Sequence, residues 1–337
     1  MISLDKAEKL KMIKNSQYYI SEFKRHNFSY NSNFFSNYAS TYLSLNTLLE
    51  SIYPTTEYSK NYKSRKNFGL SNLDNNFDKS NIKIIIENLN KNFLWIGNKW
   101  KDCYDIKSNT TIQCLQSNYI FKILRKIDFF YSNHLVIYFF DYLWKFDKKI
   151  NGIDFLLNHK ILEKIKKNYN SNLINFVHVY KPHAPYQFNK KCKFQKLSET
   201  YANSGIEEIN LYGNEYRCIL KNLTSIMSKF DDNDLVVFLG DHGWYFNEEI
   251  KNNYSNKIKN LRYTNDDFVK DRLNNVFMAI KFPKSCNNLK VPKSTVNIMR
   301  FMLSCDQKIK FDYLQDFKYL TRFEDHKDFG TTKKLDN

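Results

Sequence analysis

The sequence predicts an α/β fold organised around a mostly parallel β-sheet. Short apolar runs that are typical of buried strands alternate along the chain with longer stretches of helical periodicity. The clearest run covers residues 235–239 and is bounded by Asp234 and Gly240. Its continuous apolar character indicates a strand covered on both faces, as in a parallel sheet. A chain of 337 residues, 42% of them hydrophobic, suffices for one large domain of this class or for two smaller ones.

Further elements follow in chain order from the same two patterns. Strands are also expected at residues 93–96, 173–178 and 276–280. Helices are expected at residues 3–26, 41–52, 81–89, 204–230 and 294–303. Ser3 and Asp5 are suited to cap the first helix, whose apolar stripe is interrupted at Asn15 and Ser16.

The end of the 235–239 strand presents a candidate metal site. Asp241 and His242 follow the strand, and Gly243 permits a tight turn behind them. Ligand-binding groups gather beyond the carboxyl ends of parallel strands, and carboxylate and imidazole are both zinc ligands. An Asp-His-Gly motif also recurs by chance, in which case Asp241 is an ordinary turn residue and His242 a surface histidine.

A second candidate site lies upstream, where another predicted strand ends. His178 closes that strand, and Pro182 and Pro185 restrict the loop that presents His183 and Tyr186. A ring on a restricted loop binds a ligand with little ordering entropy, which makes His183 the stronger candidate. A histidine inside a strand pattern, such as His178, is more commonly a core residue than a ligand.

A third segment, near the amino terminus, places a hydroxyl group at a helix start. Thr41 lies at or beside the first turn of the 41–52 helix, where free backbone N–H groups and the helix dipole favour an anion. Taken alone, Ser40, Thr41 or Ser44 is better explained as a helix cap. The segment gains significance from its combination with the histidine loop and the Asp-His-Gly turn.

These three segments, in the order in which they follow one another along the chain, resemble the alkaline phosphatase and sulfatase superfamily. Within it they resemble the sulfatase-like branch that includes phosphoethanolamine and lipoteichoic acid transferases. The resemblance extends from about residue 28 to about residue 303 and rests on Thr41, Tyr53-Pro54, His183-Ala-Pro-Tyr186 and Asp241-His-Gly243. It implies an alkaline phosphatase-like three-layer α/β/α sandwich. The catalytic domain would cover residues 1–306, and residues 307–337 would form a polar carboxyl-terminal tail.

The resemblance also implies roles for individual residues. Thr41 falls on the nucleophile, and Asp241 and His242 fall on metal ligands that share one metal with its hydroxyl. His183 falls on a catalytic histidine that contacts the substrate or a second metal. The other substrate-binding candidates are Tyr186 and His178. The expected metal is zinc, with manganese, calcium and magnesium as alternatives, because coordination to a dication favours the alkoxide of threonine.

Two departures from the family pattern bear on the chemistry. Formylglycine sulfatases carry a Cys/Ser-x-Pro-x-Arg motif, whereas residues 41–45 lack its proline and arginine, so a formylglycine mechanism is not expected. Family members also begin with an apolar strand that ends in an acidic metal ligand. The chain has no such strand before Thr41, and Glu8 and Glu22 lie on the predicted first helix. Either the sequence lacks its natural beginning, or the metal site is incomplete and the protein inactive.

The expected function is that of a metal-dependent transferase or hydrolase of phosphate esters, acting through a phosphothreonine at Thr41. Its substrate would be an anionic lipid or glycan bearing a phosphate, and a phospho-headgroup would be transferred. Two alternatives stay open. One is a sulfuric ester hydrolase, and the other is a catalytically degenerate family member that binds an anionic glycan or lipid.

The net charge of +17 favours anionic partners. Nucleic acid is not the expected partner, because the lysines are dispersed and no zinc-finger spacing or RNA-recognition motif is present. Peripheral contact with an anionic membrane surface would use the same charge. His326, amid acidic residues, is better explained as part of a solvated tail than as a ligand.

Apolar runs and cysteines give the sequence evidence on cellular location. The longest membrane candidate, residues 135–144, is too short to span a bilayer and contains Asp141. Six cysteines could remain as thiols or form the local pairs Cys103 with Cys114, Cys192 with Cys218 and Cys286 with Cys305. Such pairing favours an extracytoplasmic location, periplasmic or membrane-associated, whereas a chain complete as written would be cytoplasmic.

Overall fold

The structure is a computed structural model that describes part of the chain in detail. The described residues are 1–53, 92–97, 112–115, 173–178, most of 181–244, 266–308, 311–324 and 328–335. The predicted helix at 81–89, the apolar run at 135–144, Cys103 and His326 lie outside them.

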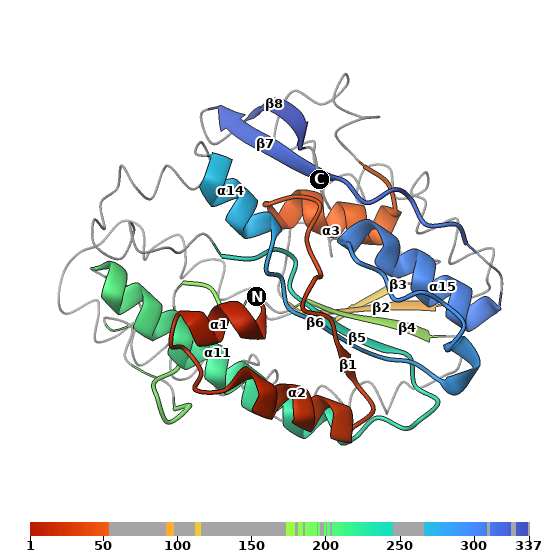
Figure 1. The fold of residues 1–337 in the computed structure, drawn as a ribbon, viewed down its shortest axis with the longest axis horizontal. Helices are drawn as coiled ribbons and strands as arrows, with labels where there is room; N and C mark the ends of the chain where they lie inside the picture. The colour runs from red at the N-terminus through yellow and green to blue at the C-terminus, as the bar shows by residue number, and fades with distance from the viewer. Residues whose placement is uncertain are drawn as a thin grey trace.

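Helices and strands alternate along the described parts of the chain, which confirms the predicted α/β class (Figure 1). The helices are α1 Leu4–Lys9, α2 Ser16–Arg25, α3 Thr41–Glu50, α11 Gly205–Met227, α14 Asp266–Leu273 and α15 Ile298–Gln307. The strands are β1 Ser29–Tyr30, β2 Asn92–Gly97, β3 Ile112–Leu115, β4 Leu173–His178, β5 Val236–Leu239, β6 Met278–Lys281, β7 Lys318–Glu324 and β8 Asp328–Leu335. Short 3₁₀ helices cover Lys284–Cys286 and Thr295–Asn297.

The predicted helix at residues 3–26 is divided into α1 and α2. Ser3 caps α1, as expected, because its hydroxyl accepts a hydrogen bond from the Lys6 backbone N–H at 3.3 Å. Asn15 caps α2 by accepting from the Tyr18 N–H at 3.2 Å. Lys11 between the helices has a φ of 57°, a left-handed conformation that ends a helical path. The interruption near Asn15 in the sequence pattern therefore marks a new helix start.

Strand pairing differs between two described sheets. In the order β3-β2-β4 all pairs are parallel, with Phe93 of β2 opposite Ile174 of β4. In the order β1-β6-β5 both pairs are antiparallel, with Val237 of β5 opposite Ile280 of β6. The strand predicted at residues 235–239 is present as β5, but its residues are half-buried rather than fully buried, and its partner β6 is antiparallel. A single, mostly parallel central sheet stays a prediction.

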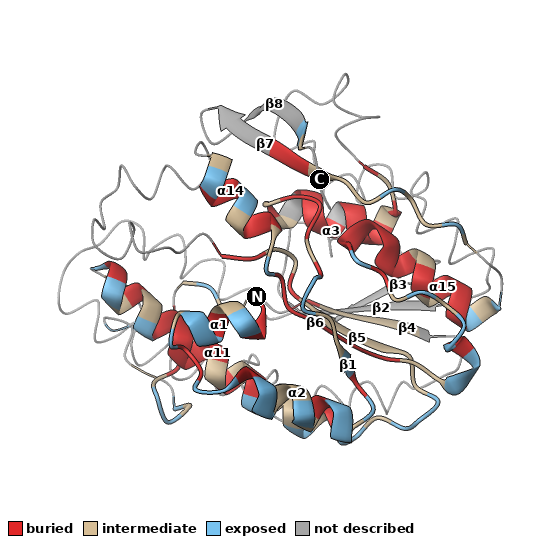
Figure 2. Cartoon of the chain, viewed as in Figure 1, coloured by how far each residue is buried: buried red, intermediate tan, exposed pale blue. Residues whose placement is uncertain are grey.

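Helices cover both faces of the β1-β6-β5 sheet (Figures 1 and 2). Successive side chains of a strand point to opposite faces, so neighbouring residues around β6 pack against different helices. Phe277 and Ala279 pack in a cluster with residues of α1, α2 and α11. Met278 and Ile280 pack in a second cluster with residues of α3 and α15. The start of α3 is thereby held close to the end of β5.

The carboxyl-terminal segment forms an antiparallel hairpin of β7 and β8. Tyr319 of β7 is buried, and its ring stacks on Tyr38 at 5.2 Å between centroids. Leu320 packs against Val269 and Leu273 of α14. Residues 307–337, expected as a polar tail, therefore supply core side chains next to α3 and α14, and the predicted domain boundary at residue 306 stays untested.

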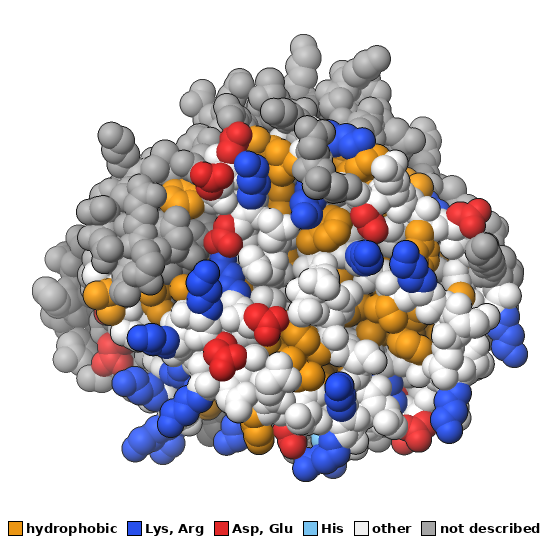
Figure 3. All heavy atoms as spheres, viewed as in Figure 1, with side chains coloured by type: hydrophobic (Ala, Val, Ile, Leu, Met, Phe, Trp, Pro, Cys, Tyr) orange, Lys and Arg blue, Asp and Glu red, His pale blue; other side chains and the backbone are white. Residues whose placement is uncertain are grey.

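Two of the three predicted cysteine pairs are disulfides. Cys192 is bonded to Cys218 and Cys286 to Cys305. Within the described residues, no helix is both long and apolar enough to cross a membrane. On the face seen in Figure 3, lysine and arginine side chains are scattered over the surface between acidic ones, and several of them gather at the lower left.

Candidate active site

Thr41 is the first residue of α3, as the sequence predicts. Ser40 precedes it in an extended conformation with a φ of −120°, and no side-chain hydrogen bond caps the helix at Ser40. The N–H groups of the first turn of a helix have no partners within the helix, and their dipoles favour negative charge. The hydroxyl of Thr41 thus stands where an anionic group is stabilised.

The hydroxyl of Thr41 meets the imidazole that follows β5. Thr41 Oγ1 lies 3.1 Å from His242 Nε2. The other ring nitrogen, Nδ1, lies 2.7 Å from the carbonyl oxygen of Gly243, which can only accept, so Nδ1 carries the hydrogen. The lone pair of Nε2 therefore points towards Thr41, while Asp241 Oδ2 lies 3.4 Å from the same nitrogen.

Two buried serines fix the Asp-His-Gly turn over the first turns of α3. Ser36 Oγ donates to the Asp241 carbonyl oxygen at 2.7 Å, and Ser44 Oγ donates to the same oxygen. The two hydroxyl oxygens are 3.0 Å apart. The capping explanation for Ser44 is therefore wrong, since its side chain bonds Asp241. Ser36 was not singled out by the sequence analysis, because a serine in an extended aromatic segment carries no functional signal.

Gly243 brings the turn against the carboxyl-terminal end of α14. Its N–H donates to the carbonyl oxygen of Arg272 at 2.7 Å. A Cβ atom at this position would lie 2.8 Å from the carbonyl oxygen of Asn274, closer than such atoms approach. Only glycine permits this contact without displacement of the backbone.

Arg272 is the functional candidate that sequence reasoning missed. It is 9% exposed, and its Nη2 lies 3.3 Å from Nε2 of His242. Nothing in the local sequence of α14 indicates this position, because the helix reads as an ordinary charged helix. The contact arises only when α14 packs against the Asp-His-Gly turn.

Burial and mutual attraction set the charges of the site. Burial lowers the pKa of His242 to about 4, although the charge of Asp241 opposes the shift. Burial alone would raise the pKa of Asp241, but attraction to protonated His242 and to the amino-terminal ammonium, with a hydrogen bond from Thr41, holds that pKa well below its usual range. At neutral pH the site therefore contains a carboxylate, a neutral imidazole and a hydroxyl group.

His178 approaches the same site from the end of β4. Its side chain is buried, which lowers the pKa of its imidazole, and the charge of Asp241 acts in the opposite direction. The charges of His178 and Asp241 therefore interact, although β4 and β5 belong to different described sheets. A role of His178 in binding substrate stays a prediction.

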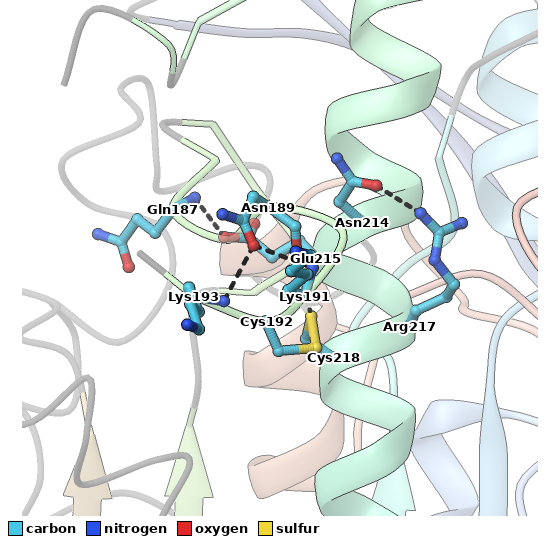
Figure 4. The surroundings of a disulfide bond; sticks show 9 residues. All are labelled: Gln187, Asn189, Lys191, Cys192, Lys193, Asn214, Glu215, Arg217 and Cys218. Carbon is cyan, nitrogen blue, oxygen red and sulfur yellow. Dashed lines mark hydrogen bonds between the residues drawn. A yellow bond between two sulfur atoms is a disulfide. The ribbon is translucent and has the colours of Figure 1, made fainter. Parts of the chain in front are cut away.

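The histidine loop is anchored on α11 by buried Glu215. Glu215 Oε1 lies 2.9 Å from Lys181 Nζ and accepts from the Gln187 N–H at 2.7 Å. The disulfide Cys192–Cys218 ties the same loop to the next turn of α11 (Figure 4). Both ends of the segment that carries His183 are therefore attached to one helix.

The two site candidates on this loop have different surroundings. His183 is exposed, and its Nδ1 contacts the carbonyl oxygen of Ala184. Tyr186 is buried, and its hydroxyl donates to Glu208 Oε1 at 3.1 Å. The roles of His183 and Tyr186 in binding substrate stay predictions.

The residues at the site fit part of a zinc centre. Asp241 Oδ2 and the Nε2 lone pair of His242 are both acceptors and lie 3.4 Å apart, an arrangement that a shared positive charge stabilises. Carboxylate oxygen, imidazole nitrogen and hydroxyl oxygen are donors that zinc accepts, and zinc usually takes four. Among the described residues, no group of three or more His, Cys, Asp or Glu side chains is arranged to hold a metal. Glu8 and Glu22 contact Ser16 and Arg25 instead.

Solved structures with a similar fold are known. The C-terminal periplasmic domain of phosphoethanolamine transferase EptC from Campylobacter jejuni has a TM-score of 0.47 and 13% identity, over 90% of this chain and 85% of that chain. The corresponding domain of EcEptC from Escherichia coli, solved in complex with Zn, has a TM-score of 0.48 and 10% identity, over 87% of this chain and 78% of that chain.

The chain is similar in structure to these two periplasmic domains. No protein-family model matches the chain, and no curated protein matches it. At these identities the likeness concerns the fold, and the chemistry of the site depends on the residues described above.

Proposed function

We propose that the protein is a transferase or hydrolase of phosphate esters in which Thr41 is the nucleophile. The observation that carries this proposal is the 3.1 Å contact between Thr41 Oγ1 and His242 Nε2 beside the Asp241 carboxylate. A threonine hydroxyl reacts poorly unless a neighbouring group removes or weakens its bond to hydrogen. The neutral imidazole of His242 has its lone pair directed at that hydroxyl.

The described residues have distinct tasks in the reaction. The Nδ1 bond to Gly243 keeps the His242 ring in the tautomer whose Nε2 lone pair faces Thr41 and would coordinate the metal, and Thr41 would lose its proton to solvent when its oxygen coordinates the same dication. Thr41 Oγ1 forms a bond to phosphorus while the bond from phosphorus to the leaving oxygen breaks. The N–H groups at the start of α3 stabilise the charge on the phosphoryl oxygens.

Zinc is the metal that suits the site. Asp241, His242 and Thr41 would hold it, and a bound dication would favour the threonine alkoxide and stabilise phosphoryl charge. Manganese, calcium or magnesium would supply the same charge. The proposed fold is the three-layer α/β/α sandwich expected for the family. The proposed substrate is an anionic lipid or glycan that carries a phosphate.

An extracytoplasmic location accompanies this proposal. Disulfides persist in oxidising compartments, and the described residues contain two, Cys192–Cys218 and Cys286–Cys305.

A degenerate, binding-only protein is the second candidate function. It is favoured by the absence, among the described residues, of three acidic, histidine or cysteine side chains grouped around a metal. Such a protein would retain the fold and bind an anionic glycan or lipid without turning it over.

Turnover of aryl esters separates these functions. The protein would be assayed with added zinc on an aryl phosphate and on the matching aryl sulfate. We expect phosphate turnover that Thr41→Ala reduces by at least about 10³-fold. Thr41→Ser, which keeps a hydroxyl, should retain part of the activity, and Thr224→Ala on α11 should retain all of it. Turnover of the sulfate alone would contradict the proposal, and turnover of neither ester would favour the binding protein.

A further inference from the structure

We infer that Arg272 binds the anionic phosphoryl group of the substrate and orients it for attack by Thr41. This inference rests on the proposed function and names the residue that recognises the charge of the substrate. It concerns a side chain on α14, distant in sequence from both Thr41 and His242.

The position of Arg272 is fixed by its own backbone. Its carbonyl oxygen accepts the N–H of Gly243 at 2.7 Å, so a backbone hydrogen bond joins the end of α14 to the Asp-His-Gly turn. Its Nη2 lies 3.3 Å from His242 Nε2, and Thr41 Oγ1 lies 3.1 Å from that same nitrogen. The guanidinium and the nucleophilic hydroxyl therefore contact one atom from two different elements.

The chemistry of the guanidinium suits a phosphoryl group. Its planar set of N–H donors matches two phosphate oxygens at once, and arginine keeps its charge at any physiological pH. The residue is only 9% exposed, so water would screen its attraction to a bound anion only weakly. Groups that are fixed and withdrawn from water before the reaction stabilise charge most effectively.

Other charged groups lie close to Arg272 and make contacts of their own. Asp271, the adjacent residue on α14, bonds to Lys6 Nζ and belongs to a different contact. Two cationic groups lie against His242: the amino-terminal ammonium of Met1 donates to its backbone carbonyl oxygen at 2.9 Å, and the guanidinium of Arg272 contacts its ring at Nε2.

Inorganic phosphate is the probe for this site, because it carries the anionic group without the rest of a substrate. Its affinity would be measured by isothermal titration calorimetry on wild type, Arg272→Gln, Arg272→Lys and Lys270→Gln. Lys270 is the matched control: it is a half-exposed cation of the same helix and pairs with Asp267. Circular dichroism would verify the fold of each variant.

We expect Arg272→Gln to weaken phosphate binding by at least about 10-fold, the loss of one charge-assisted contact. Arg272→Lys should fall between this variant and wild type, since lysine keeps the charge but loses the planar donors. Lys270→Gln should bind as wild type does. If Arg272→Gln fails to fold, Arg272→Lys decides: weaker binding supports the inference, and equal binding overturns it.

The inference is overturned if folded Arg272→Gln binds phosphate as tightly as wild type, or if wild type does not bind phosphate. The proposed function fails by a different result, namely turnover that survives Thr41→Ala. Thr41→Ala should still bind inorganic phosphate, because Arg272 is intact in that variant. The two outcomes are therefore measured independently.

Discussion

The hydroxyl of Thr41 lies 3.1 Å from Nε2 of His242, although 201 positions separate the two residues in the sequence. The contact joins the first residue of α3 to the turn that follows β5. Two serines hold the turn in place through the carbonyl oxygen of Asp241. A hydroxyl, an imidazole and a carboxylate thus meet at the end of one sheet.

Metal binding should depend on Asp241. Asp241→Asn keeps the size of the side chain but removes its charge, and we expect zinc affinity to fall by at least about 10-fold. Asp267→Asn on α14 is the control, because its carboxylate is 88% exposed and pairs with Lys270. Zinc content after equilibrium dialysis would be measured by mass spectrometry. Equal zinc in wild type and Asp241→Asn would remove Asp241 from the metal site.

Gly243 should be intolerant of a side chain. In Gly243→Ala the new Cβ would meet the Asn274 carbonyl oxygen at 2.8 Å, and backbone must move to relieve the contact. We expect a loss of about 1–3 kcal/mol in the free energy of unfolding, measured in urea. Gly213→Ala on α11 is the control, because its Cβ would meet the flexible side chain of Met12 at 3.2 Å. A loss as large in Gly213→Ala as in Gly243→Ala would argue against a special requirement at the turn.

The stability of the metal-free protein should decrease below neutral pH. Burial lowers the pKa of His242 to about 4, so the unfolded chain takes up a proton there before the folded protein does. Stability contributed by the neutral ring is complete above pH 6.5 and is lost as the pH falls towards 4. We expect this residue to account for on the order of 2 kcal/mol between pH 7 and pH 5. Urea unfolding in the presence of a chelator would measure it, and an unchanged pH dependence in His242→Asn would count against the assignment.

The buried pair of Lys181 and Glu215 should stabilise the histidine loop. Glu215 is fully buried and Lys181 nearly so, at 0% and 10% side-chain exposure. Glu215→Gln would leave the lysine charge without this carboxylate, and we expect the free energy of unfolding to drop by about 3 kcal/mol. Glu22→Gln is the control, since it breaks a pair with an Arg25 side chain that is 68% exposed and should change stability by less than about 1 kcal/mol. Comparable losses in the two variants would contradict the anchoring role.

The sequence predicted those features of the site that depend on local patterns. Thr41 stands at the first position of a helix because apolar spacing begins there, and Asp241 follows a strand because an apolar run ends there. Two of the three local cysteine pairs that the sequence offered as an alternative to free thiols, Cys192–Cys218 and Cys286–Cys305, are disulfides.

Features that depend on packing between distant elements could not be predicted. Arg272 approaches His242 only because α14 packs on the Asp-His-Gly turn, and its own helix gives no sign of this. The antiparallel partner of β5 was missed because an apolar run does not specify the direction of its neighbour. Tyr319, in a segment read as polar, is buried through its stacking on Tyr38.

The most direct test of the account is to look for the phosphoryl group on Thr41. The protein would be incubated with zinc and an aryl phosphate, quenched in acid, digested and analysed by tandem mass spectrometry. The account predicts a phosphorylated peptide with the modification at Thr41, present in wild type and absent in Thr41→Ala. Phosphate turnover by wild type with no phosphorylation at Thr41, or with phosphorylation at another residue, would contradict it.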